Sequence, residues 1–299
     1  MHTRVKARVV AHALHDMMQK ASSILIMGHQ QEDFDCLGAA VGVAQMARSL
    51  GKDVHIIVSG SNLSVQKIVE MVETDTALAE PADGPDLFVA EKPRLFITEE
   101  EAMPLLFGAL VFVVDTHRPS RVAAPKLLSC AEKVVVIDHH RRSEDFIVKP
   151  FLVYVEPAAS STSELVTELI EYFGKDIRLP KGEATALYAG IVLDTKKFSV
   201  RTGSRTFEAA AFLRRVGADT VDVMKLFQND LDATIIRYQI IQAARLYRNE
   251  IAIAAVDHTV PRTIAAQAAD ELLNISGIMT SFVLYPDGDV VFMSARSIG

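Results

Sequence analysis

The sequence is poor in cysteine, with only Cys36 and Cys130 among its 299 residues. Two cysteines cannot form a disulfide framework or a zinc ribbon, and their scarcity is typical of a reducing compartment. Basic residues are also in deficit, since 31 Lys and Arg against 38 Asp and Glu give a formal net charge of −7. This charge argues against a protein that coats nucleic acid or a membrane surface. We therefore expect no duplex nucleic acid as a partner.

Several common segments are absent as well. No apolar run approaches the roughly 18 residues that a membrane span needs, and the first 20 residues are too polar for a secretory signal. The chain has no internal repeat, no G-x-x-x-x-G-K-[ST] loop and no G-x-G-x-x-G turn between a strand and a helix. P-loop and Rossmann nucleotide binding are therefore unsupported. As given, the chain is expected to be cytoplasmic.

Six short apolar runs dominate the first half of the sequence. They are near-continuous rather than alternating, which is typical of strands buried on both faces of a parallel sheet. Helical patterns separate several of them, as at 38–50 and 163–173. The sequence therefore predicts an α/β fold with a parallel sheet. The predicted strands cover 24–27, 54–58, 95–98, 109–114, 134–137 and 151–155.

The pattern changes after about residue 180. Helices are predicted over 184–192, 206–216 and 232–247, followed by a strand at 251–256 and a helix at 264–273. Two further strands, 279–285 and 290–295, flank a Pro-Asp-Gly-Asp turn that is typical of a hairpin. We expect a smaller α+β domain at the C-terminal end. The predicted divisions are an N-terminal linker helix (1–22), a main domain (23–225), a helical connector (226–248) and the small domain (249–299).

Three predicted strands end in residue types that bind metals. In open parallel sheets, ligands bind beyond the carboxyl ends of the strands, so these side chains should converge on one crevice. A further carboxylate closes the predicted helix at 184–192. The candidates are His29, Asp33, Asp35, Asp115, Asp138, His139, His140 and Asp194.

The candidate set contains imidazoles and carboxylates but requires no thiolate. Such ligands suit Mn²⁺, Mg²⁺ or Fe²⁺ better than structural zinc, and there are enough of them for two ions that share a carboxylate. Each residue alone has an ordinary structural interpretation: Asp33 and Asp35, for example, could cap the next helix. Their convergence at one predicted edge favours the metal site.

Other polar features have two interpretations. His117 is expected to support a metal ligand rather than to be one. The basic stretch of Lys196, Lys197, Arg201 and Arg205 is either a solvated face or a phosphate-steering surface.

Several motifs resemble the DHH phosphoesterase superfamily. They begin with Gly28-His29-x-x-x-Asp33-x-Asp35, Asp115-Thr116-His117 and Asp138-His139-His140. Further stretches resemble one branch, the membrane-anchored cyclic-di-AMP phosphodiesterases of bacteria, and the similarity covers essentially the whole chain. These stretches are VIDHHRR at 136–142, EPAASSTSEL at 156–165, AGIVLDTK at 189–196, RTGSRTF at 201–207 and SARS at 294–297.

The resemblance implies a role for each matching residue. One metal would be bound by His29, Asp33 and Asp115, and a second by Asp35, Asp115, His139 and Asp194, with Asp115 bridging. His140 would contact the scissile phosphate, Asp138 would orient a ligand, and Arg296 would bind a substrate phosphate. The implied metals are two divalent cations, foremost Mn²⁺.

The resemblance also implies the reaction and the context. A hydroxide activated by two metals would hydrolyse cyclic di-AMP to linear pApA. Whether the chain forms a homodimer is left open. The glycine-rich G-G-G-H motif that follows Ser-Ala-Arg in this branch does not occur up to Gly299, which implies a partial DHHA1 domain at 249–299. The natural full-length protein would be anchored in the cell membrane with this part facing the cytosol.

Two other functions remain open at this point. One is a nano-RNase or pAp phosphatase acting on short linear oligonucleotides. The other is a cyclic-dinucleotide sensor that binds without turnover. The preference between cyclic di-AMP and cyclic di-GMP is also left open.

Overall fold

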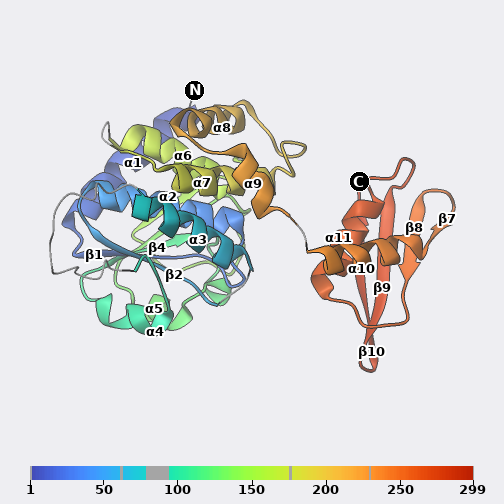
Figure 1. The fold of residues 1–299 in the computed structure, drawn as a ribbon. Helices are drawn as coiled ribbons and strands as arrows, with labels where there is room; N and C mark the ends of the chain where they lie inside the picture. Colours follow the sequence, from blue (N-terminus) through green and yellow to red (C-terminus); the bar gives the residue numbers. More distant parts are fainter. Residues whose placement is uncertain (1, 61–62, 79–93, 175–176, 229, 299) are drawn as a thin grey trace. The chain divides into compact units, whose positions relative to one another are not determined.

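The computed structural model describes residues 2–60, 63–78, 94–174, 177–228 and 230–298. The chain forms two compact units, Met1–Leu226 and Phe227–Gly299, each with its own sheet and core (Figure 1). Among the described residues, no helix combines the length and apolar character that crossing a bilayer requires.

The first unit is built on a six-stranded sheet in the order β3-β2-β1-β4-β5-β6, with every neighbouring pair parallel. The near-continuous apolar runs explain its burial, since every residue of β1, β4 and β5 is buried. The predicted α/β class and all six predicted strands are confirmed, with ends that shift by at most one residue. The strands are β1 (Ser23–Met27), β2 (Asp53–Ile57), β3 (Phe96–Ile97), β4 (Leu110–Val114), β5 (Val134–Asp138) and β6 (Leu152–Val155).

Helices cover both faces of this sheet. In Figure 1, α4 and α5 lie on one side, whereas α1, α2, α6 and α7 lie on the other. The helices are α1 (His2–Lys20), α2 (Phe34–Ser49), α3 (Leu63–Leu78), α4 (Glu99–Ala102), α5 (Pro125–Cys130), α6 (Thr162–Phe173), α7 (Lys181–Asp194), α8 (Ser204–Val216) and α9 (Thr220–Leu226), with short 3₁₀ turns η1 (Met103–Leu105) and η2 (Pro119–Arg121).

The N-terminal helix α1 is packed into this unit. Ala7, Ala11, Leu14 and Met18 form a fully buried stripe with helical spacing, and α1 contacts α6. The helix predicted for this segment is present, and Val10 and Met17 flank its buried stripe and are half-buried.

The strand order places the site. The chain moves outward from β1 through β2 to β3, and then returns to the other side of β1 to build β4, β5 and β6. The crossovers therefore diverge between β1 and β4, which leaves a crevice outside the carboxyl ends of these two strands. His29 and Asp115 come directly after these ends.

The second unit has a mixed four-stranded sheet in the order β10-β9-β8-β7, packed against two helices. Only β8 and β9 are parallel, and the predicted hairpin joins β9 to β10. Its elements are α10 (Leu231–Gln242), β7 (Ala244–Tyr247), β8 (Ile251–Ala255), α11 (Arg262–Leu272), β9 (Thr280–Asp287) and β10 (Val290–Ser297).

The helix predicted over 232–247 is too long at its C-terminal end. Helix α10 stops at Gln242, and Ala244–Tyr247 instead forms an edge strand that pairs antiparallel with β8. Helix α10 packs against α11 and β8 within the second unit, whereas a connector was predicted over 226–248. The local pattern of these residues is compatible with a helix, but antiparallel pairing with β8, which follows after a short turn, overrides it.

Candidate metal centre

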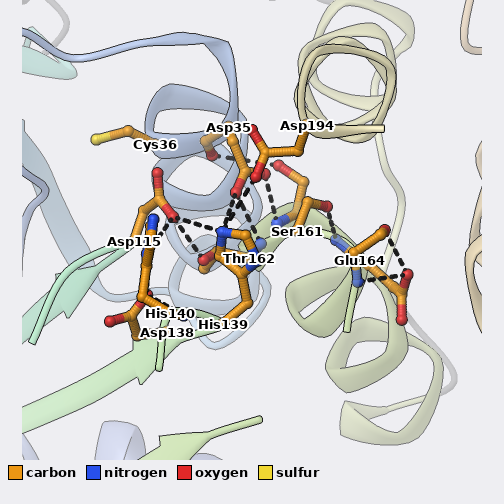
Figure 2. Close-up of polar contacts among 12 residues, drawn as sticks. Asp35, Cys36, Asp115, Asp138, His139, His140, Ser161, Thr162, Glu164 and Asp194 are labelled. Carbon is orange, nitrogen blue, oxygen red and sulfur yellow. Dashed lines mark hydrogen bonds and ion pairs between the residues drawn. The ribbon is translucent and has the colours of Figure 1, made fainter. Parts of the chain in front are cut away.

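The predicted ligands gather at the carboxyl edge of the six-stranded sheet. They come from the segments after β1, β4 and β5, from the first turn of α2 and from the last residue of α7. Figure 2 shows those labelled Asp35, Asp115, His139, His140 and Asp194 close together. Three groups of potential ligand atoms lie within 4.8 Å of one another: His29–Asp33–Asp115, Asp35–His139–Asp194 and Asp115–His139–His140. The first two groups match the sets predicted for two separate metals, with Asp115 also adjoining the second.

The segment after β1 turns sharply into α2 and carries His29 and Asp33. Asp33 is the N-cap of α2, and its Oδ1 accepts hydrogen bonds from the backbone N–H groups of Asp35 and Cys36, both at 3.0 Å. His29 Nε2 lies 3.4 Å from Asp115 Oδ2 and 3.8 Å from Asp33 Oδ1. Asp33 therefore caps α2, as the alternative interpretation predicted, and it also lies close enough to His29 to share a metal ion with it.

Asp35 is fully buried in the first turn of α2 and faces the N-terminus of α6. Its two carboxylate oxygens accept hydrogen bonds from the backbone N–H groups of Thr162 (2.7 Å) and Ser163 (2.8 Å). These are donors of the first turn of α6, which have no partner within the helix and which carry partial positive charge. The helix end therefore holds this carboxylate in one orientation.

Asp115 follows β4 in the left-handed region of backbone conformation, with φ of 59°. Aspartate tolerates this region better than most residues, and such strain is concentrated at functional sites. Its Oδ1 accepts a hydrogen bond from Thr162 Oγ1 at 2.9 Å and lies 3.6 Å from His139 Nε2. The turn thus places one carboxylate between His29 and His139.

The ring of His139 is buried, and neither ring nitrogen makes a hydrogen bond within the described part of the chain. Nevertheless, its Nε2 lies 3.0 Å from Asp194 Oδ2, and the same nitrogen is 4.0 Å from Asp35 Oδ2. Two donors that bind a common ion at about 2.1 Å lie about 3 Å apart. A buried imidazole without a partner beside carboxylate oxygens is therefore suited to share a cation with them.

The electrostatics of the cluster are unfavourable without a cation. Burial raises the pKa of Asp35 well above its usual value, and the charges of Asp115 and Asp194 raise it further. Burial likewise raises the pKa of Asp115. Burial alone would lower the pKa of His29, but the carboxylates of Asp115 and Asp33 outweigh it and raise this pKa to about 11. Divalent cations would neutralise this concentration of carboxylates, so the donor set fits them.

Behind the cluster, Asp138 holds two histidines. Its Oδ1 accepts hydrogen bonds from the backbone N–H of His140 (3.1 Å) and from Nδ1 of the same residue (2.8 Å), while Oδ2 accepts one from His117 Nδ1. His117 Nε2 accepts a hydrogen bond from the Ser143 backbone N–H at 3.1 Å, which fixes the His117 tautomer. Asp138 thereby accepts three hydrogen bonds from two histidines, and His140 is exposed.

The sequence pattern did not single out Thr162 and Ser163 as part of the site. The run Ser160-Ser161-Thr162-Ser163 before an apolar helix was the available signal, because such runs begin helices. Ser161 is indeed the N-cap of α6, and its Oγ accepts from the Glu164 backbone N–H at 3.0 Å. That this helix end faces Asp35, 127 residues earlier, could not be inferred locally.

Two basic features predicted from the sequence have carboxylate partners in their own unit. Arg296 is on β10 of the second unit, where its Nε lies 3.2 Å from Asp270 Oδ1, and its contact with substrate stays a prediction. In the basic stretch after Asp194, Arg205 donates two hydrogen bonds of 2.6 Å to Glu168. Arg205 is therefore a structural cation rather than a phosphate-steering one.

Comparison with known proteins gives a consistent result. Residues 23–191 match the DHH family, N-terminal domain. The chain is 44% identical over 305 residues to the cyclic-di-AMP phosphodiesterase GdpP of Bacillus subtilis, and 40% identical over 303 residues to the cyclic-di-AMP phosphodiesterase PdeA of Listeria monocytogenes. Each alignment covers 99% of this chain but only 44% of the relative, so the chain spans less than half of these proteins.

A solved structure shares the fold. An exopolyphosphatase-related protein from Bacteroides fragilis superposes with a TM-score of 0.75 at 19% identity, covering 97% of this chain and 83% of that protein.

Proposed function

This chain belongs to the DHH family, and on that premise we propose that it is a metal-dependent phosphodiesterase that hydrolyses cyclic di-AMP to linear pApA. The observation that carries the proposal is the pair of ligand groups, His29–Asp33–Asp115 and Asp35–His139–Asp194, beside a common Asp115. Sites with two neighbouring cations and shared carboxylates are typical of enzymes that cleave phosphate esters.

The two ligand groups would each hold one divalent cation, with Mn²⁺ foremost because the donors are imidazoles and carboxylates without a thiolate. The chemistry that such a pair supplies when bound is activation of water and neutralisation of charge on a phosphoryl group. Within the protein, Thr162 and Ser163 hold Asp35, and Thr162 also holds Asp115. These hydrogen bonds orient the ligands before any cation binds.

In this proposal, His140 binds the scissile phosphate. Its hydrogen bond to Asp138 raises the pKa of its imidazole above the usual value, which favours the cationic form. With Nδ1 donating to Asp138, the remaining Nε2–H is free to donate to a phosphate oxygen as charge develops there. Asp138 and His117 are positioning residues that keep the ring in this orientation.

The choice of cyclic di-AMP is supported by the relatives. Two proteins named as cyclic-di-AMP phosphodiesterases are 40–44% identical over nearly the whole of this chain, including all the candidate ligands' segments. Such similarity across the site favours the same substrate. A contribution of Arg296 to phosphate binding belongs to this proposal.

The proposal is tested by incubating the purified chain with Mn²⁺ and cyclic di-AMP and separating the products by chromatography. We expect pApA from the wild type and none from Asp194→Asn, which removes a ligand at the C-terminal end of α7. The matched control is Asp16→Asn, because Asp16 is exposed on α1. Cleavage of linear pApA but not of the cyclic compound would overturn the substrate in favour of short linear oligonucleotides. Tight binding without any product would indicate a sensor.

A further inference from the structure

Two arginines line the cavity beside the metal centre. This cavity has a volume of about 660 Å³, within the range of small-molecule sites, and its lining includes His29, Asp115 and Asp194 together with Arg118 and Arg121. The sequence motifs did not identify either arginine as part of the site. They are the fixed positive charges among the described residues that line this cavity.

Neither guanidinium group is engaged by another described residue. Within the described residues, no hydrogen bond or ion pair joins the side chain of Arg118 or Arg121 to a partner, although four aspartates line the same cavity. Other arginines of this unit behave differently: Arg205 pairs with Glu168 and Arg48 with Glu183. Free guanidinium groups in a cavity lined by carboxylates are suited to an anion that enters from solvent.

The backbone that carries these arginines is tied to the metal-ligand segments. Arg118 follows Asp115-Thr116-His117 directly and precedes the turn η2, and Arg121 is the last residue of that turn. The Gln30 backbone N–H donates to the Arg121 carbonyl at 2.6 Å, next to an isolated bridge between His29 and Val122. The Arg118 backbone N–H donates to Thr116 Oγ1 at 3.2 Å. The turn is therefore held in register with His29 and Asp115.

We propose that Arg118 and Arg121 bind the second, non-scissile phosphate of a two-phosphate substrate. The inference rests on the proposed function, in which one phosphate lies at the metal centre. A cyclic dinucleotide carries its other phosphodiester on the same ring, so that group would enter the same cavity. Planar guanidinium groups bind phosphate oxygens bidentately. The arginines would thus select for substrates with a second phosphate, without acting on the bond that is cleaved.

The test compares three substrates of the Mn²⁺-loaded enzyme. Cyclic di-AMP has two phosphates, pApA has a terminal phosphate beside its phosphodiester, and ApA has the phosphodiester alone. For Arg118→Gln and Arg121→Gln we expect KM for cyclic di-AMP to rise by about tenfold to a hundredfold, as for loss of a charged hydrogen bond. We expect kcat for cyclic di-AMP and turnover of ApA to stay within about threefold of the wild type.

Two controls separate this role from a structural one. Arg8→Gln removes an exposed arginine of α1 and should leave all three substrates unaffected. Mn²⁺ affinity, measured by calorimetry, and the melting temperature should be the same in the two variants as in the wild type. Arg118→Lys retains the charge without the bidentate fork, so its KM should lie between those of the wild type and Arg118→Gln.

The inference fails if ApA turnover falls as much as that of cyclic di-AMP, or if neither changes. Failure of the proposed function looks different, because the wild type itself would then leave cyclic di-AMP intact. In that case the same variants are compared on pApA against ApA, which differ by one phosphate. If none of the three compounds is cleaved, their equilibrium binding to the wild-type protein is measured by calorimetry. If the wild type then binds pApA no more tightly than ApA, the inference is wrong.

Discussion

Asp115 connects the two ligand groups, since its carboxylate lies beside His29 on one side and His139 on the other. Replacing it with Asn keeps the shape of the side chain but removes the charge that both cations would share. We expect Asp115→Asn to lower cyclic di-AMP turnover by more than about a hundredfold, because residues that only support metal ligands already cost up to that amount. Calorimetric titration with Mn²⁺ should show both binding events weakened.

The exposed Asp16→Asn is again the matched control, and it should change neither turnover nor Mn²⁺ binding. If Asp115→Asn weakened one binding event and left the other at the wild-type affinity, the shared role of this carboxylate would be wrong.

Protonation of the candidate ligands His29 and His139 should compete with metal binding. The pKa of His29 is raised to about 11, and that of His139 to about 9, because neighbouring carboxylates outweigh the effect of burial. Both imidazoles therefore carry a proton at neutral pH in the metal-free chain, and a cation must displace it. We expect Mn²⁺ affinity to rise with pH between about 6 and 8 and to be lost progressively as pH falls.

Calorimetry of Mn²⁺ binding in buffers of different ionisation enthalpy measures the protons released. An affinity that is independent of pH over this interval, with no proton release, would contradict the prediction.

At the level of whole elements, the packing of α7 against α2 and α6 brings the last ligand into place. Gly190 of α7 makes this approach possible, since a Cβ there would lie 2.2 Å from Ser163 Oγ and 2.9 Å from Asp35 Oδ1. We expect Gly190→Ala to destabilise the protein by about 3 kcal/mol through overpacking. It should also weaken Mn²⁺ binding, because the contact displaces Asp35.

Gly174→Ala is the matched control, because a Cβ at Gly174 meets no atom within 4 Å. Its thermal and Mn²⁺-binding curves should overlay those of the wild type. A Gly190→Ala protein as stable as the wild type would show that α7 can shift away from α2 without cost.

Elements also show where sequence patterns were sufficient. The strands of the first unit are buried on both faces, so their continuous apolar runs predicted them correctly. The histidines and aspartates at the ends of these strands predicted the metal site. The sequence pattern predicts strand β7 as part of a helix, because its alternation is short and its pairing partner β8 lies beyond a turn. Arg118 and Arg121 carried no recognisable motif, since their significance lies in which cavity they line.

At the scale of the whole molecule, the two units have separate hydrophobic cores. All the described candidate metal ligands belong to the first unit. Binding stabilises only the folded unit that contains the site. We expect two calorimetric transitions, with Mn²⁺ at about a hundredfold excess over its Kd raising the first unit's transition by about 5–10 °C. The second unit's transition should not move.

The transitions are assigned with Leu272→Ala, which removes a side chain buried in the second unit's core at a cost of about 2–5 kcal/mol. This variant should lower only the transition that Mn²⁺ leaves unchanged. A single transition that responds to both treatments would show that the units unfold together.

Many features of this protein could be predicted from its sequence, because they depend on local chemistry. Buried strands must be apolar, helices begin at capping residues, and metal ligands must be imidazoles or carboxylates, so the fold class, the family resemblance and the ligand residues could all be predicted. Contacts between distant segments could not, because they depend on how elements pack in three dimensions. Folding alone determined that the N-terminus of α6 holds Asp35, that Asp138 holds both His117 and His140, and that two arginines without a partner among the described residues line the same cavity as the metal ligands.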